Sequence, residues 1–207
     1  QASFMAKPLV DQAGSGLHVH VSLLDAQGRN VFAGTAQAPA AALLHAIGGL
    51  QASAADTMLL FAPHANSYRR YVPNAFVPLG RSWGYNNRTV AMRIPHSDAA
   101  NTRIEHRIAG ADANVYLACA AVLAGMLHGL EQRLDPGPPI VGNAYAQTEQ
   151  HSPHWRGSIE EFLGSAFIAE HFGERFRHLY GQQKRKEQRS FDTQVTDLDY
   201  AWYLRAV

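Results

Sequence analysis

The sequence contains one cysteine, Cys119, among 207 residues. A single cysteine excludes an internal disulfide framework and is typical of a reducing compartment, so we expect a cytoplasmic protein. Charged residues are also scarce at 17%, and 18 basic residues against 17 acidic ones give a formal net charge of +1. This balance does not indicate nucleic-acid binding, and any anion-binding site must be local.

Signals for membrane insertion and secretion are lacking as well. Residues 113–130 contain no Asp, Glu, Lys or Arg, but these 18 residues reach only the lower limit for a bilayer span. The run includes Asn114, His128 and many alanines, which favours a helix buried between protein layers and no membrane association. The chain begins at Gln1 without a signal peptide, so we expect a fragment whose true N-terminus lies upstream.

Familiar motifs for phosphate binding and nucleophilic catalysis are missing. The sequence has no Walker-type glycine loop, no protein-kinase signature and no nucleophile elbow. A nucleotide or phosphate site would therefore have to be built from other residues.

The apolar content is 46%, which is enough for one substantial core. Strict alternation predicts a strand at 17–23, followed by a turn and a short return strand at Val31-Phe32. Two further strands are predicted at 89–94 and 103–108.

Helical spacing predicts one helix at 39–55, with Gly48-Gly49 as a weak point, and another from Asp112 as N-cap to about Arg133. With the strands, these helices predict an α+β fold in which antiparallel strands form part of an active-site sheet with helices packed behind them.

The Pro-rich stretch 135–139 cannot continue a helix and is the clearest internal boundary in the sequence. It divides the chain into residues 1–134, which carry the predicted strands, and residues 135–207, which we expect to be helical. The helices expected in the second part are 158–166, opened by a capping box at Ser158, then 169–189 and 195–207.

The stretch 66–108 holds seven arginines but only two acidic residues, Asp98 and Glu105. At least five of these arginines therefore have no acidic partner nearby in the sequence. Guanidinium groups bind phosphate and carboxylate oxygens in bidentate fashion, so the surplus favours an anionic ligand, although structural ion pairs remain the alternative. Along 103–108, a period of two places Arg103, Glu105 and Arg107 on one face of a strand.

The strand at 17–23 places His18, His20 and Ser22 on one face and its apolar residues on the other. An H-x-H pattern alone is often only a solvated polar face. Here Gly14-Ser15-Gly16 precedes it, and this flexible backbone can offer amide donors to an anion. The imidazoles are candidate ligands for a divalent cation, with Glu105 as the candidate carboxylate.

Several segments occur in a distinctive order and spacing over most of residues 1–130. They are Lys7-Pro8, Gly14–Ser22, Asn66–Pro73, Asn87–Thr89, Arg93–Pro95, Arg103–Arg107 and Asp112–Leu117. In combination they resemble the C-terminal half of the catalytic domain of glutamine synthetases.

This resemblance implies an ATP-dependent ligase that phosphorylates the γ-carboxylate of glutamate and lets an amine displace the phosphate. It also implies Mg or Mn as cofactor and a homo-oligomer with active sites at subunit interfaces. His18 and Glu105 match ligands of the metal at the ATP phosphates, and His20 and Ser22 match nucleotide contacts.

The remaining site residues are implied in the same way. Gly14 and Arg70 match positions that hold the substrate glutamate, with Arg107 near its γ-carboxylate or the transferred phosphoryl group. The arginines that match phosphate clamps are Arg88, Arg93 and Arg103. Arg88 and Arg107 are the expected catalytic residues, because phosphoryl transfer depends on positioning and charge neutralisation.

One departure from the family concerns the acceptor. Ammonia-using members have a glutamate after the Arg-x-Val-Pro segment, and the matching position here is Phe76. An aromatic residue there suits an amine larger than ammonia. The sequence of Arg81–Arg88 is also similar to the corresponding segment in the γ-glutamylpolyamine and glutamylamide synthetase branch. We therefore expect an acceptor such as putrescine or spermidine.

A second departure is that the family's other carboxylate ligands and its small N-terminal domain would lie upstream of Gln1. We therefore expect the 207-residue chain to be inactive by itself. Three alternatives stay open: a true glutamine synthetase that uses ammonia, a non-catalytic family member that acts as a scaffold, and a phosphate-binding module of unrelated fold.

Overall fold

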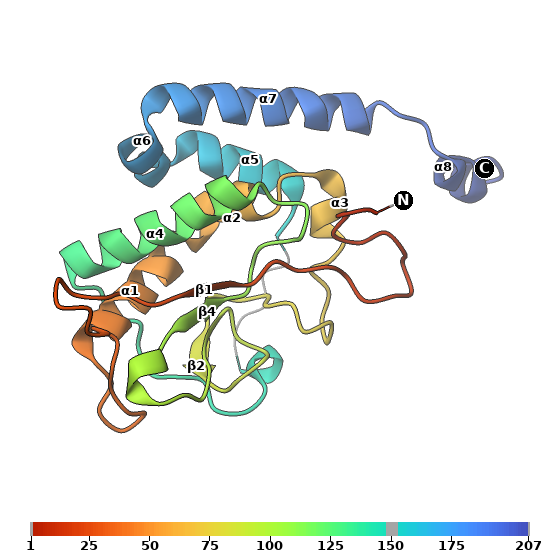
Figure 1. The fold of residues 1–207 in the computed structure, drawn as a ribbon. Helices are drawn as coiled ribbons and strands as arrows, with labels where there is room; N and C mark the ends of the chain where they lie inside the picture. Colours follow the sequence, from red (N-terminus) through yellow and green to blue (C-terminus); the bar gives the residue numbers. More distant parts are fainter. Residues whose placement is uncertain (1, 148–152, 207) are drawn as a thin grey trace.

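The computed structural model describes residues 2–147 and 153–206. Its helices are stacked in layers on one side of a small four-stranded sheet (Figure 1). This arrangement confirms the expected α+β fold.

The sheet has the strand order β1-β4-β3-β2. The strands are β1 (Val19–Val21), β2 (Trp83–Tyr85), β3 (Met92–Ile94) and β4 (Ile104–His106). β4 pairs in antiparallel fashion with β1 and β3, whereas β2 runs parallel to β3. The strands predicted at 17–23, 89–94 and 103–108 are present but shorter than expected, and the second is confined to the last three residues of its predicted range. β2 was not predicted.

The return strand predicted at Val31-Phe32 does not form. The hairpin closes through a single bridge between Leu24 and Asn30, followed by a hydrogen bond from the Val31 amide to the Leu23 carbonyl. The backbone turns at Val31 and Phe32, because the Asn30 side chain accepts the Phe32 amide and the Asn30 carbonyl accepts the Ala33 amide. The Phe32 ring is fully buried in the core.

The layer behind the sheet consists of α1 (Ala41–Ala52), α2 (Ala54–Phe61) and α4 (Val115–Gln132). The short α3 (Ala65–Tyr68) follows α2, and 3-10 turns occupy Ala99–Asn101 (η1) and Ala144–Ala146 (η2). The main core cluster joins side chains of β3 and β4 to those of the helices and includes Met92, Ile104, Phe61 and Ile47.

The N-cap of α4 is Asn114, not Asp112 as predicted. The Asn114 side chain accepts hydrogen bonds from the amides of Tyr116 and Leu117, whereas Asp112 accepts the Ser67 hydroxyl at 2.6 Å. By length and composition α4 could cross a membrane. Among the described residues, α4 is buried on one face only. The prediction that this helix lies buried between two protein layers is therefore wrong.

The C-terminal part is helical, as expected, with different boundaries. Its helices are α5 (Trp155–Gly164), α6 (Ala166–Phe172), α7 (Glu174–Asp192) and α8 (Asp197–Tyr203). α5 packs on α2, and α7 packs on α5 to form the outermost layer, while α8 lies apart at the end of the chain (Figure 1). The division of the chain at residue 135 stays a prediction.

Two helix boundaries in this part differ for local reasons. The N-cap of α5 is His154, whose Nδ1 accepts the Gly157 amide at 3.0 Å, so Ser158 lies inside the helix and is buried. The helix expected at 169–189 is interrupted at Gly173, where φ is +88°. Glycine tolerates this left-handed backbone and ends α6 before α7 begins.

Gly48-Gly49, predicted to be a weak point of α1, is instead where α1 meets other parts of the chain most closely. A Cβ atom placed on Gly49 would lie 2.0 Å from the Gly125 carbonyl oxygen and 2.5 Å from the Gly129 nitrogen. A Cβ on Gly129 would likewise lie 2.1 Å from the His45 carbonyl oxygen. Small residues are required here because the two backbones touch.

We expect Gly49→Ala to destabilise the protein by about 1–3 kcal/mol or more, because the methyl group would force α1 and α4 apart. The free energy of unfolding, measured by chemical denaturation, tests this. Gly164→Ala is the matched control, since a Cβ there meets nothing within 4 Å. Equal stability of the Gly49 and Gly164 variants would contradict the close-packing interpretation.

Candidate active site

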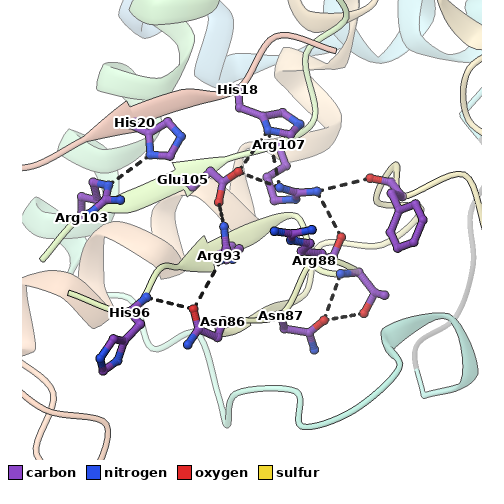
Figure 2. A network of polar contacts seen from close by, with 12 residues as sticks. His18, His20, Asn86, Asn87, Arg88, Arg93, His96, Arg103, Glu105 and Arg107 are labelled. Atoms are coloured by element: carbon purple, nitrogen blue, oxygen red, sulfur yellow. Dashed lines mark hydrogen bonds and ion pairs between the residues drawn. The ribbon is translucent and has the colours of Figure 1, made fainter. Parts of the chain in front are cut away.

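Charged side chains from three neighbouring strand segments meet around Glu105 (Figure 2). Glu105 Oε1 lies 2.6 Å from Arg107 Nη1 and 3.0 Å from His18 Nδ1. Its other oxygen, Oε2, lies 2.7 Å from Arg93 Nη1. The carboxylate side chain is only 4% exposed, so one buried acid holds two arginines and a histidine together.

The strand register explains this convergence. Glu105 lies on β4 directly opposite His20 on β1 and opposite Arg93 on β3. Residues opposite each other on neighbouring strands point to the same face of a sheet, and so do residues two apart on one strand. The alternation of Arg103, Glu105 and Arg107 predicted from the sequence is therefore confirmed.

The opposite face of β4 belongs to the core. Ile104 is fully buried, and the His106 ring lies 4.6 Å from the ring of Phe61. Burial, with a smaller contribution from His18, lowers the pKa of His106 to about 3. This imidazole is therefore neutral at ordinary pH and adds no charge beneath the site.

The protonation states of the central pair follow from their surroundings. Burial alone would raise the pKa of Glu105, but hydrogen bonds and charges from Arg93 and Arg107 hold the pKa below its ordinary value. Burial and the positive charge of Arg107 lower the pKa of His18, against the opposing effect of Glu105. At neutral pH the site therefore contains a carboxylate and a neutral imidazole.

His20 and Arg103 form a second contact on the same face. Arg103 Nε donates to His20 Nδ1 at 3.2 Å, and its Nη1 donates to the Asn101 carbonyl. Ser22 lies one step further along this alternating face and is exposed. The structure thus brings His20 and Arg103 together but leaves Ser22 outside the network around Glu105.

Gly14 and Arg70 also lie in contact. A Cβ on Gly14 would be 2.7 Å from Arg70 Cγ and 2.8 Å from the Ala6 carbonyl oxygen. The Arg70 guanidinium is buried, donates to the Ile108 carbonyl and to Tyr71 Oη, and is close enough to lower the pKa of His18. Glycine at position 14 is therefore what lets the N-terminal segment pass over this arginine.

Arg107 links the sheet to two loops. Its Nη2 donates to the carbonyl of Arg88 at 3.2 Å and to that of Phe76 at 3.4 Å. Phe76 adopts a left-handed backbone with φ of +54°, and its side chain is 65% exposed. Arg88 is also exposed and lies next to Arg107 in Figure 2. The predicted catalytic pair and the predicted acceptor residue are therefore neighbours.

His18 and Glu105 can supply part of a metal site. Two ligands about 2.1 Å from an octahedral cation lie about 3 Å apart, and His18 Nδ1 and Glu105 Oε1 are 3.0 Å apart. No third histidine, cysteine or acidic side chain completes a cluster with them among the described residues. The chain thus fits a divalent cation as a partial donor set.

Several polar residues that support the site were given no role by the sequence analysis. Asn86 accepts from Arg93 and from the His96 amide, and it has a φ of +52°. Asn87 and Thr89 bind each other and residues near 140–144. The Asn86-Asn87 dipeptide was the available signal, because asparagine tolerates left-handed turns better than most residues.

Comparisons with known proteins agree with this geometry. Residues 1–203 match the family model of the glutamine synthetase catalytic domain. The chain is 40% identical over 205 residues to the γ-glutamylputrescine synthetase of Escherichia coli K12, covering 99% of this chain and 43% of that protein. It is 38% identical over 204 residues to the γ-glutamylethanolamide synthetase of Streptomyces coelicolor, covering 98% and 43% respectively.

Solved structures give the same result. Two structures of GmaS, one without ligand and one with ADP, superpose with TM-scores of 0.85 and 0.86 at 29% identity. They cover 99% and 98% of this chain, and the chain covers 48% and 49% of theirs. The chain thus spans less than half of the relatives it matches, and it belongs to the glutamine synthetase family, within the catalytic domain.

Proposed function

We propose that this chain is part of an ATP-dependent ligase that joins the γ-carboxylate of glutamate to a primary amine through γ-glutamyl phosphate. The observation that carries the proposal is the cluster of Arg93, Arg107 and His18 around the single carboxylate of Glu105. Relatives that ligate putrescine, ethanolamine and isopropylamine to glutamate support an organic amine as acceptor.

The arginines serve the phosphoryl transfer. Arg93 and Arg107 are held by Glu105, and Arg103 by His20 and the Asn101 carbonyl, so their orientations are fixed before a ligand arrives. One carboxylate cannot neutralise all of these cations, and the excess positive charge suits the phosphates of ATP. Preorganised cations stabilise the charge on the transferred phosphoryl group without reorganisation during the reaction.

His18 and Glu105 would hold a divalent cation, Mg or Mn, with further ligands from outside the described residues. Such a cation, when bound, neutralises phosphate charge. His20 and Ser22 would contact the nucleotide from the same face of β1. The chain's own contribution here is to keep His18 neutral and Glu105 ionised at neutral pH.

Gly14 and Arg70 would bind the substrate glutamate, with Arg107 close to its γ-carboxylate. In the first step an oxygen of that carboxylate attacks the γ-phosphorus of ATP, and ADP leaves. Arg88 and Arg107 would stabilise the developing charge. In the second step the amine nitrogen attacks the acyl carbon, phosphate leaves, and the nitrogen loses its extra proton.

Phe76 would face the acceptor amine. Its exposed ring stands at the position where the resemblance implies a glutamate in ammonia-using members. An aromatic surface suits the methylene chain of a larger amine. The alternatives are an ammonia-using enzyme and a non-catalytic scaffold of the same family. Retention of the complete arginine cluster favours a catalytic member, and family membership excludes a module of unrelated fold. We also expect the full-length protein to be a cytoplasmic homo-oligomer.

The full-length protein that carries this chain is expected to release phosphate from ATP in the presence of glutamate and an amine. We expect putrescine or spermidine to give a higher kcat/KM than ammonia, with ethanolamine included for comparison. Ammonia as the preferred acceptor would contradict the role of Phe76, and absence of turnover with every acceptor would favour the scaffold.

Substituting Phe76→Glu is expected to raise the ratio of kcat/KM for ammonia to kcat/KM for putrescine by about tenfold or more, because a carboxylate can accept the proton of the attacking nitrogen. Phe76→Leu is the matched control, since it bears the same left-handed backbone strain without the carboxylate. If both variants change the ratio equally, proton acceptance at this position is not the cause.

The isolated 207-residue chain is expected to give no measurable γ-glutamyl transfer, because the two described metal donors are an incomplete coordination sphere. Phosphate release by the purified chain, with glutamate, ATP and amine at saturating concentration, tests this. Turnover above that of an Arg107→Ala control would show that the chain is self-sufficient.

A further inference from the structure

A segment outside the predicted site is bound along the edge of the sheet next to it. We call residues 137–145 the strap. The strap begins on β2, where Trp83 Nε1 donates to the Gly137 carbonyl at 3.0 Å and the Ile140 amide donates to the Trp83 carbonyl at 2.8 Å. It then continues past the turn that contains Arg88.

The middle of the strap is fixed to both neighbours of Arg88. Asn87 Nδ2 donates to the carbonyls of Gly142 at 2.7 Å and Ile140 at 3.2 Å. Thr89 Oγ1 accepts the Ala144 amide at 2.9 Å and donates to Asn87 Oδ1 at 2.6 Å. All the hydrogen-bonding groups of the Asn87 amide are thus occupied, so the turn and the strap form one rigid unit.

The end of the strap reaches the loop that carries Phe76. Tyr145 Oη donates to the Val77 carbonyl at 2.7 Å. The preceding carbonyl, that of Phe76, accepts from Arg107. Two successive carbonyl groups are therefore held from different elements, one by an arginine of the sheet and one by a tyrosine of the strap.

The Tyr145 side chain is suited to this role. It is partly buried against the core. Burial raises the pKa of Tyr145, and the positive charge of nearby Arg107 only partly offsets this, so the hydroxyl keeps its proton and remains a donor.

We propose that Tyr145 is a positioning residue for the acceptor amine. By holding the Val77 carbonyl, it fixes the backbone from which the Phe76 ring projects, while the rest of the strap fixes the turn around Arg88. The proposal rests on the proposed function, because it assigns Phe76 to the amine side of the site. The Val77 side chain is buried in the core. For the Phe76 and Val77 carbonyls, however, the contact from Tyr145 is shorter than the 3.4 Å contact from Arg107.

The test is Tyr145→Phe in the full-length protein. Loss of the hydroxyl leaves the Val77 carbonyl without this donor, and we expect the KM for the amine to rise about 5- to 20-fold. The KM values for ATP and glutamate should stay within about twofold, because the arginine cluster is held by Glu105 and not by the strap. Discrimination between putrescine and ethanolamine should also decrease.

Tyr85→Phe is the matched control. Tyr85 lies on β2, and its buried hydroxyl has no hydrogen-bond partner among the described residues, so its removal should leave every KM unchanged. Thr89→Val removes the hydrogen bond that the Ala144 amide makes next to Arg88, and it should lower kcat through Arg88 more than it raises the KM for the amine. An unchanged amine KM in Tyr145→Phe, or an equal rise of all three KM values, would overturn the proposal.

The proposed function and the role of Tyr145 can fail separately. If the unchanged protein prefers ammonia, the proposed acceptor is wrong, while the KM for ammonia in Tyr145→Phe still tests the positioning role. If the protein has no turnover, hydrogen exchange of residues 72–80 provides the measurement. Faster exchange in Tyr145→Phe than in Tyr85→Phe is expected, and equal exchange would overturn the proposal.

Discussion

The ion pairs of Glu105 are the interaction on which the rest of the site depends. Its two oxygens contact His18 in the segment that leads into β1, Arg93 on β3 and Arg107 directly after β4. Removing one partner of a buried charge pair costs more than the pair contributes, because the remaining charge is left without compensation. The carboxylate therefore holds together a group of cations that would repel one another without it. His18 nevertheless stays neutral beside this carboxylate, because burial and the positive charge of Arg107 lower its pKa more than Glu105 raises it.

Much of this site could be predicted from the sequence because it depends on short-range periodicity. Alternation along the strand predicted that Arg103, Glu105 and Arg107 share one face of the sheet. It also predicted that His18 and His20 share one face of their strand. The sequence did not show the register in which the neighbouring strands pair. That Glu105 lies opposite both His20 and Arg93 is a property of strand pairing between residues 12 and 85 positions apart in the chain. The resemblance to a known family placed His18 and Glu105 at one metal site, but it did not give the pairing of the strands.

The errors have a common physical origin in contacts between distant parts of the chain. Gly48-Gly49 was predicted to weaken α1 because glycine has a low helix propensity, but close packing of Gly49 against α4 leaves no room there for a side chain without displacing the helices. Asp112 has the chemistry of an N-cap, yet its Oδ2 accepts the hydroxyl of the distant Ser67, and Asn114 caps α4 instead. The contact between Tyr145 and Val77 spans 68 residues and leaves no local pattern.

Under the proposed function, the loop around Phe76 would let the acceptor vary while the phosphate chemistry stays constant. Phe76 contributes its backbone carbonyl to Arg107 and exposes its ring, so the two parts of one residue serve different sides of the site. Asn74 and Phe76 both have positive φ, a conformation that costs about 1 kcal/mol or more for a residue with a side chain. The contacts to two successive carbonyls offset this strain and preserve the turn. Because those contacts involve backbone atoms, the side chain at position 76 is free to change without disturbing Arg107. Under the proposed function, the choice of amine is then separable from the transfer of phosphate.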